Sequence, residues 1–253
     1  MKTGKIALIT GATAGFGEAC AERFAREGYN LVITGRREER LQQLQQKLQE
    51  QYKADVRYLV FDVRSKPGCE AALQSLPAAW QAVDVLVNNA GLALDLSTID
   101  EGNTDDWDTM LDTNVKGLLY VSRIVMPWMK ARKQGHIVNI GSTAAKTVYA
   151  KGNVYCASKA AVDALSQGMR IDLLPYSIKV TAVHPGAAET EFSLVRFKGD
   201  AGKAKDVYKG FTPLSGQDVA DVVYYCCSLP PHVCINDLVV TPTAQANAYY
   251  IHR

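Results

Sequence analysis

The segment Thr10-Gly11-Ala12-Thr13-Ala14-Gly15-Phe16-Gly17 decides the fold, because of what stands on either side of it. The stretch from Lys5 to Thr10 is of strand length with an apolar centre, Ile6 to Ile9, and the residues from Gly15 to Gly28 have the spacing of an amphipathic helix. Glycines at such a junction let the backbone turn tightly and come close to a pyrophosphate at the helix N-terminus. The segment therefore predicts the first strand, loop and helix of a dinucleotide-binding domain.

Apolar runs of strand length alternate with longer amphipathic stretches along the rest of the chain. This order predicts an α/β fold, a Rossmann-like doubly wound parallel sheet flanked by helices, in one domain over residues 1–253. The interval 186–213 has no regular pattern, and we expect it to form a lid over the substrate. We expect further strands at 30–34, 55–60, 83–87, 136–140, 179–184 and 237–240, and helices at 36–52, 67–75, 105–132, 153–175 and 216–228.

Composition excludes several classes of function. The chain has 253 residues, with 28 basic and 26 acidic ones spread along it, so no nucleic-acid or membrane footprint is expected. Six cysteines without Cys-x-x-Cys spacing, and no apolar leader before the first strand, favour a reducing cytoplasm. Four scattered histidines lack the spacing of metal ligands, so no metal site is expected.

The end of the second predicted strand indicates which nucleotide is bound. The sequence there reads Thr34-Gly35-Arg36-Arg37, without the acidic residue that holds the ribose hydroxyls in NAD enzymes. Two arginines suit the 2′-phosphate of NADP, because their forked guanidinium groups bind phosphate oxygens in pairs. The alternative is that Arg36 and Arg37 only begin a charged helix, although cations at a helix N-terminus oppose its dipole. We therefore expect NADP as the cofactor.

Tyr155 and Lys159 are the candidate proton-transfer residues. They stand four residues apart on a predicted helix, so both side chains project from the same face. A tyrosine has a pKa of about 10 in water, and a neighbouring cation lowers it by favouring the phenolate. Tyr155 could then donate a proton in a reduction and accept one in an oxidation. The alternative is an ordinary solvent-facing pair.

Taken together, these motifs resemble the short-chain dehydrogenase/reductase family over essentially the whole chain. The family's glycine spacing, its Asp62-Val63 and Asn88-Asn89-Ala90-Gly91 segments and its Tyr-x-x-x-Lys pair all occur in the expected order. The resemblance implies catalytic roles for Ser142, which would hold the substrate carbonyl, and for Asn114, in a proton relay to Lys159. It implies a cofactor site of Gly11, Thr13, Gly15, Phe16, Gly17, Arg36, Arg37, Asp62, Val63, Asn89, Tyr155, Lys159, Pro185, Gly186 and Thr190.

Within that family, the segments 11–18, 88–94 and 190–199 are similar to NADP-dependent 3-hydroxy acid dehydrogenases, which oxidise serine and allo-threonine, and to sulfoacetaldehyde reductases. This resemblance implies a small anionic substrate, which needs a cation or several donors in its pocket. Ser142, Lys146, Tyr149 and Arg196 are the expected substrate contacts. The run from Ala145 to Tyr149 departs from that of the 3-hydroxy acid enzymes, so a carboxylate and a sulfonate both remain open.

Two further expectations follow from the family. Its members are usually homotetramers, built on the helices expected at 105–132 and 153–175. Some proteins with this fold bind NADP without catalysis, and such a module would be free to lose its proton-transfer residues. All four candidates are retained here. We therefore expect an enzyme, either a hydroxy acid dehydrogenase or, as the alternative, an NADPH-dependent sulfoacetaldehyde reductase that makes isethionate.

Overall fold

The computed structural model describes residues 4–253, and its centre is one parallel sheet of seven strands in the order β3-β2-β1-β4-β5-β6-β7. Each strand pairs in parallel with its neighbours. The direction of winding reverses between β1 and β4, which is where ligands bind in open α/β sheets. The strands are β1 (Ile6–Ile9), β2 (Asn30–Gly35), β3 (Val56–Val60), β4 (Val83–Asn88), β5 (His136–Ile140), β6 (Lys179–Pro185) and β7 (Asp237–Val240).

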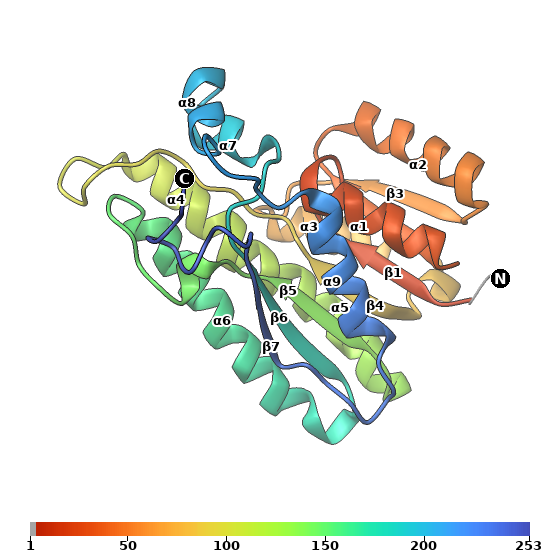
Figure 1. Ribbon diagram of the computed structural model, residues 1–253. Helices are drawn as coiled ribbons and strands as arrows, with labels where there is room; N and C mark the ends of the chain where they lie inside the picture. Colours follow the sequence, from red (N-terminus) through yellow and green to blue (C-terminus); the bar gives the residue numbers. More distant parts are fainter. Residues whose placement is uncertain (1–3) are drawn as a thin grey trace.

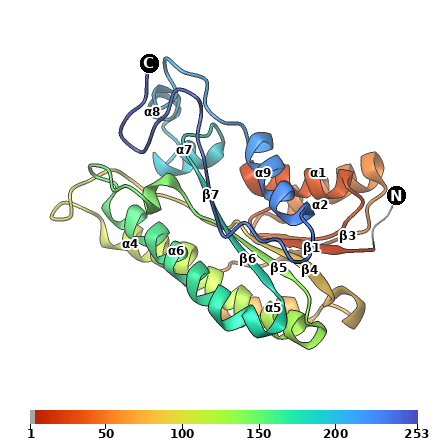
Figure 2. The same ribbon diagram turned by 60° about the horizontal axis from the view of Figure 1, so that its bottom comes forward.

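Helices cover both faces of this sheet (Figures 1 and 2). One face carries α1 (Gly15–Arg26), α2 (Glu38–Tyr52) and α9 (Gly216–Ser228), and the other carries α3 (Lys66–Gln74), α4 (Thr104–Leu111), α5 (Leu118–Arg132) and α6 (Asn153–Leu173). Two short helices, α7 (Glu191–Arg196) and α8 (Ala201–Asp206), stand beyond one end of the sheet, close to the C-terminus. The Rossmann-like fold expected from the sequence is confirmed.

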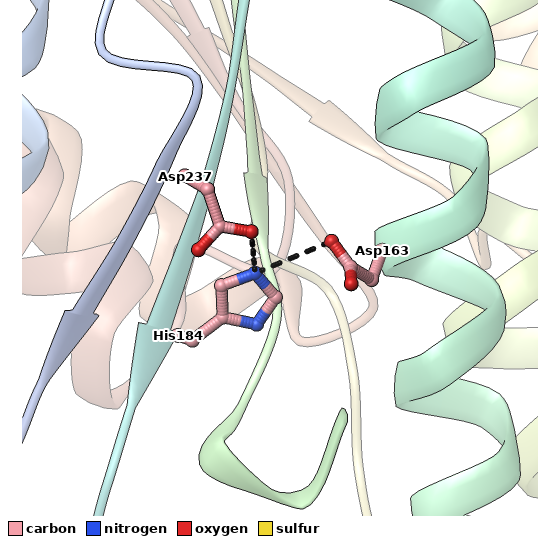
Figure 3. Close-up of side chains that lie close together, drawn as sticks. All are labelled: Asp163, His184 and Asp237. Atoms are coloured by element: carbon pink, nitrogen blue, oxygen red, sulfur yellow. Dashed lines mark ion pairs between the residues drawn. The ribbon is translucent and has the colours of Figure 1, made fainter. Parts of the chain in front are cut away.

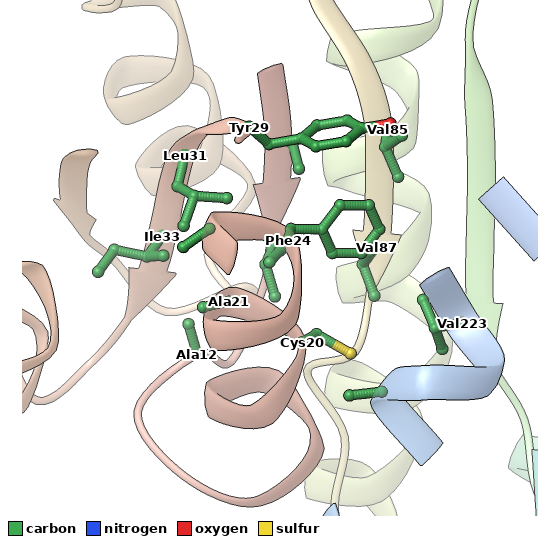
Figure 4. Packing of buried hydrophobic residues seen from close by; sticks show 14 of the residues in the cluster. Ala12, Cys20, Ala21, Phe24, Tyr29, Leu31, Ile33, Val85, Val87 and Val223 are labelled. Carbon is green, nitrogen blue, oxygen red and sulfur yellow. The ribbon is translucent and has the colours of Figure 1, made fainter. Parts of the chain in front are cut away.

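A hydrophobic core lies on each face of the sheet. Figure 4 shows part of the core on the face covered by α1, α2 and α9. Phe24 of α1 is fully buried there, and its ring makes edge-on contacts with Tyr29 and Tyr224 at 5.0 and 5.6 Å between centroids. Full burial of one such side chain contributes about 1.5–3 kcal/mol. The packing of α1 against α9 therefore fixes the helix that begins at the glycine loop.

Three expected elements differ in detail from the structure. The helix expected at 105–132 is α4 and α5 joined by a π-helical segment, η2 (Asp112–Gly117). The helix expected from residue 36 begins at Glu38, where two acidic residues in the first turn suit the helix dipole. The interval 186–213 contains α7 and α8, because Thr190 and Asp200 accept hydrogen bonds from their first turns as N-caps. Six-residue helices are too short to show a clear period in sequence.

None of the helices within residues 4–253 is long and apolar enough to cross a membrane.

Candidate active site

The glycine loop between β1 and α1 is held against the end of β4. The Asn89 amide nitrogen donates to the carbonyl oxygens of Thr10 and Gly11 at 2.8 and 3.1 Å, and the Thr10 hydroxyl accepts from the Asn89 N–H at 3.0 Å. A Cβ on Gly17 would lie 2.3 Å from the Gly11 oxygen, so only glycine fits at this position. The loop is therefore a fixed backbone surface that opens toward the carboxyl ends of the strands.

A cleft runs along this edge of the sheet from the end of β2 to Tyr155. Its position across the β1/β4 reversal is the one expected for a dinucleotide. Most of the expected cofactor residues line it. They are Gly11, Thr13, Gly15, Phe16, Arg36, Arg37, Asp62, Val63, Asn89, Tyr155, Lys159 and Thr190. Gly17, Pro185 and Gly186 do not line the cleft, although Gly17 supports the loop from below.

Three arginines stand at the end of the cleft beside β2. Arg37 donates to the Thr13 hydroxyl at 2.8 Å and to Glu191 at 2.9 Å, and Arg40 makes a second ion pair with Glu191 at 2.5 Å. Arg36 is the most exposed of the three and lies 3.8 Å from Asp62. The sequence analysis missed Arg40, although in the helix expected at 36–52 its spacing of three and four residues from Arg37 and Arg36 would have placed all three on one face. In the structure Arg37 is the N-cap of α2 and Arg40 lies in its first turn. These cations fit a 2′-phosphate, since Glu191 already shows that they bind an anion.

Asn114 lies in η2 and is almost completely buried. Its amide nitrogen donates to the Leu92 carbonyl at 2.8 Å and to the Ser158 hydroxyl at 2.9 Å, and its amide oxygen accepts from the Leu92 N–H at 2.8 Å. π-Helical turns inside α-helices often occur at functional sites. Here the turn directs Asn114 toward Gly91, which also lies next to Lys159.

Lys159 lies on the second turn of α6 with its ammonium group inside the protein. Its Nζ donates to the Ile140 carbonyl at 2.9 Å and lies 6.0 Å from the centre of the Tyr155 ring. Burial lowers the pKa of Lys159 to about 8, because the charged form loses its hydration. At neutral pH the group is mostly charged, yet it can release a proton at small cost.

Tyr155 lies at the inner end of the cleft, with Ser142 near its hydroxyl group. The Ser142 Oγ accepts from the Ala144 N–H at 3.1 Å. Burial raises the pKa of Tyr155, while the positive charge of Arg196 and the nearby Ser142 hydroxyl oppose that rise. Apolar side chains surround the pair, so water is largely excluded from the proton-transfer site.

Arg196, the last residue of α7, is the cation nearest to this pair. Its guanidinium carbon lies 5.0 Å from the centre of the Tyr155 ring and 5.2 Å from that of Phe192, and its Nη2 donates to the Tyr149 hydroxyl at 2.7 Å. Its Nε is buried without a hydrogen-bond partner. No carboxylate among residues 4–253 forms an ion pair with it. The guanidinium group therefore has unused capacity for an anion.

Lys146, the other expected anion contact, is not brought to the cleft. Its Nζ donates to Asp237 at 2.6 Å and to Asp163 at 2.9 Å, and the side chain does not line the cleft. Two carboxylates already neutralise its charge. The side chain turns away because these aspartates, 17 and 91 residues distant in sequence, meet on that side of the loop.

A glycine loop at the β1/α1 junction and the Tyr155–Lys159 pair line one cleft, as the family resemblance of the sequence implies. Asn114 and Ser142 do not line this cleft, although Asn114 lies against Gly91, which does. The sequence profile of the short chain dehydrogenase family matches residues 5–199. This chain belongs to the short-chain dehydrogenase family. As a short-chain dehydrogenase it has the Rossmann-like sheet and the Tyr-x-x-x-Lys pair in one domain.

Individual relatives are similar over nearly their whole length. The NADP-dependent 3-hydroxy acid dehydrogenase YdfG of Escherichia coli is 47% identical over 98% of this chain and 99% of its own. Sulfoacetaldehyde reductase 2 of Chromohalobacter salexigens is 45% identical over 98% of both chains. Among solved structures, the closed form of a serine dehydrogenase complexed with NADP+ is 47% identical, covers 98% of this chain and 99% of its own, and superposes with a TM-score of 0.91.

Proposed function

We propose that this short-chain dehydrogenase is an NADP-dependent oxidoreductase that interconverts small anionic hydroxy acids with the matching aldehydes or ketones. The observation that carries the proposal is Arg196, a cation without an acidic partner among the described residues, set 5.0 Å from the centre of the Tyr155 ring. An anionic group on Arg196 would place a carbonyl a few atoms away next to the Tyr155 and Ser142 hydroxyls. The relatives named for 3-hydroxy acids and sulfoacetaldehyde support an anionic substrate.

The cofactor would occupy the cleft, with the 2′-phosphate at the arginines after β2 and the pyrophosphate at the glycine loop. When bound, NADPH supplies the hydride that adds to the carbonyl carbon. The protein supplies the proton: Tyr155 donates it to the carbonyl oxygen, which Ser142 holds, and Lys159 and Asn114 stand behind Tyr155 on the route to replace it. In oxidation the same groups act in reverse.

A panel of substrates tests this function. NADPH oxidation is measured with succinic and malonic semialdehydes, sulfoacetaldehyde and an uncharged aldehyde of similar size, with serine, 3-hydroxypropionate and isethionate in the reverse direction. We expect kcat/KM for the anionic carbonyls to exceed that for the uncharged one. A preference for sulfoacetaldehyde over both semialdehydes would establish the sulfoacetaldehyde reductase alternative. Absence of NADPH oxidation with every carbonyl, together with tight NADPH binding, would establish a non-catalytic NADP-binding module.

The role of Arg196 is tested by comparing anionic and uncharged substrates in Arg196→Ala. Arg196→Ala should raise KM for the anionic substrates at least tenfold, since charge-assisted hydrogen bonds contribute about 1.5–3 kcal/mol. The uncharged aldehyde should be affected far less. Equal losses for both substrates would restrict Arg196 to ordering the segment 186–213. We propose this segment as the substrate lid because Phe192 and Val195 of α7 line the cleft, and Arg196 at the end of α7 lies against Tyr155.

We further propose a homotetramer in a reducing cytoplasm. Exposed apolar side chains on α5, on α6 and just after α6 support assembly through these helices, including Leu119, Ile171 and Leu174, which are 37, 73 and 74% exposed. The proposed reducing compartment is supported by the six cysteines, all of which are free thiols. Analytical ultracentrifugation would measure the assembly, and Ile171→Glu should dissociate it.

A further inference from the structure

Asp163 and Asp237 lie on either side of a buried histidine, His184 (Figure 3). The ring of this histidine also contacts the backbone of Ser142. His184 of β6 is completely buried, and its Nε2 lies between Asp237 of β7, at 3.4 Å, and Asp163 of α6, at 3.7 Å. Lys146 bridges the same two carboxylates. The Lys146 ammonium group thus already neutralises the two carboxylates that could otherwise bind a metal ion.

The other ring nitrogen of His184 faces the serine. Its Nδ1 lies 3.3 Å from the backbone nitrogen of Ser142 and 3.2 Å from the Ser142 carbonyl oxygen. The ring lies so close to the chain that a Cβ on Gly141 would stand 2.3 Å from Nδ1. Gly141 is therefore the residue that allows the imidazole to approach the peptide before Ser142.

The charges around the ring determine which nitrogen carries the proton. Burial and the nearby Lys146 lower the pKa of His184, while Asp237 and Asp163 oppose that change, so the ring is neutral at pH 7. A proton on Nε2 points a positive dipole at two carboxylates, whereas a bare Nε2 would point a lone pair at them. The Nε2-protonated form is favoured, and it leaves Nδ1 free to accept the Ser142 N–H.

The same cluster fixes the other end of the serine turn. The short helix η3 (Thr143–Ala145) begins at Ser142, whose Oγ accepts from its first turn, and ends just before Lys146. Lys146 is anchored on Asp163 and Asp237. The turn that carries the Ser142 hydroxyl is therefore held at both ends by one group of side chains.

From this geometry we infer that His184 is a positioning residue for Ser142. Its Nδ1 holds the serine N–H, and Asp163, Asp237 and Lys146 hold the ring tautomer and the end of the turn. The serine hydroxyl thereby stays aligned with Tyr155. This inference rests on the proposed function only in assuming that Ser142 holds the substrate carbonyl.

Two amide substitutions at position 184 distinguish the role of Nδ1 from that of Nε2. In His184→Asn an amide oxygen can take the place of Nδ1 and still accept the Ser142 N–H, whereas in His184→Gln the amide reaches the place of Nε2 and leaves the serine N–H without its acceptor. An ordinary hydrogen bond changes an equilibrium by a factor of about 3 to 10. We expect kcat to fall by about that factor in His184→Gln and in His184→Leu, and to stay within about twofold of the parent in His184→Asn. NADPH affinity should be unchanged in all three.

His136→Leu is the matched control. It removes a buried histidine, hydrogen-bonded to Thr181 at 2.7 Å, from the opposite end of the sheet, so it should lower Tm without lowering kcat. Equal losses of kcat in His184→Asn and His184→Gln, or a parent-like kcat in His184→Leu, would overturn the inference and leave the ring with a packing role.

Ring ¹⁵N NMR of the parent protein tests the tautomer without using activity. We expect the neutral ring of His184 to carry its proton on Nε2 at pH 7 and above, and a neutral ring protonated on Nδ1 would contradict the proposed mechanism of positioning. If none of the carbonyl compounds tested supports NADPH oxidation by the parent protein, the proposed function fails. The tautomer measurement does not depend on activity and remains a test of the inference. If Asp163→Asn/Asp237→Asn, made at partly exposed positions, leaves both the tautomer and kcat unchanged, the carboxylates have no part in positioning.

Discussion

The guanidinium carbon of Arg196 lies 5.0 Å from the centre of the Tyr155 ring, closer than the Lys159 ammonium at 6.0 Å. Burial raises the pKa of Tyr155, and the charge of Arg196 opposes that rise. Arg196 comes from α7 and Tyr155 from α6, so the acidity of Tyr155 depends on two segments that are far apart in sequence. One of these segments is the proposed lid.

The first prediction concerns the pH dependence of catalysis. Arg196→Gln removes a charge that opposes the burial-raised pKa of Tyr155, so that pKa should rise further. Oxidation of an uncharged alcohol requires the phenolate as base, and its kcat/KM should therefore rise at higher pH in the variant than in the parent. Arg196→Lys, which keeps a positive charge, is the control. A parent-like profile in Arg196→Gln would show that Arg196 does not act on Tyr155.

The second prediction concerns the proton itself. Tyr155→Phe removes the transferable proton and keeps the ring in its apolar surroundings, so kcat should fall by about 10²–10⁴-fold. NADPH binding, measured by fluorescence titration, should stay within a few-fold of the parent because the rest of the cleft is intact. A variant that retains more than half of the parent kcat would rule out Tyr155 as the proton donor.

The third prediction concerns the choice of nucleotide. Arg36→Ala/Arg37→Ala should reduce the preference for NADPH over NADH by roughly tenfold or more, since each charge-assisted contact to the 2′-phosphate is lost. Arg40→Ala should have a smaller effect in the same direction, because its guanidinium group shares Glu191 with Arg37. The ratio of the two Kd values is the measurement. An unchanged ratio in the double variant would place the phosphate elsewhere.

The fourth prediction concerns Glu191, whose carboxylate occupies Arg37 and Arg40 in this structure. A bound 2′-phosphate would have to compete with this carboxylate for the same arginines. Glu191→Gln should therefore tighten NADP+ binding by about two- to tenfold, while NADH binding, which involves no 2′-phosphate, should not change. Weaker NADP+ binding would show instead that Glu191 orders the arginines for the phosphate.

The sequence predicted the sheet, its flanking helices and the placement of Tyr155 and Lys159 in one cleft, because these follow from local signals. Buried parallel strands are apolar runs, and the glycine loop and the Tyr155–Lys159 spacing are fixed by the backbone geometry they serve. Arg40 could have been found by the same reasoning, from its spacing to Arg36 and Arg37 in the helix expected at 36–52, even though α2 begins only at Glu38.

Features that depend on distant partners could not be predicted in this way. Lys146 was expected near the substrate by charge alone, but its direction is set by Asp163 and Asp237, which only the folded chain brings together. The environment of His184 depends on the same meeting of β6, β7 and α6. A single sequence contains the residues of such a cluster without showing that they are neighbours.

The number of residues in the π-helical turn η2 determines where the Asn114 side chain points. A π turn accommodates an extra residue in an otherwise α-helical stretch, so α4 and α5 are out of phase with each other by about one residue, or about 100°. Loss of a single residue between Asp112 and Gly117 would bring the two helices back into phase and rotate Asn114 away from Leu92 and Ser158. When related chains are aligned, a one-residue gap inside this turn therefore marks a change in the position of the Asn114 side chain, even where every side chain around it is retained.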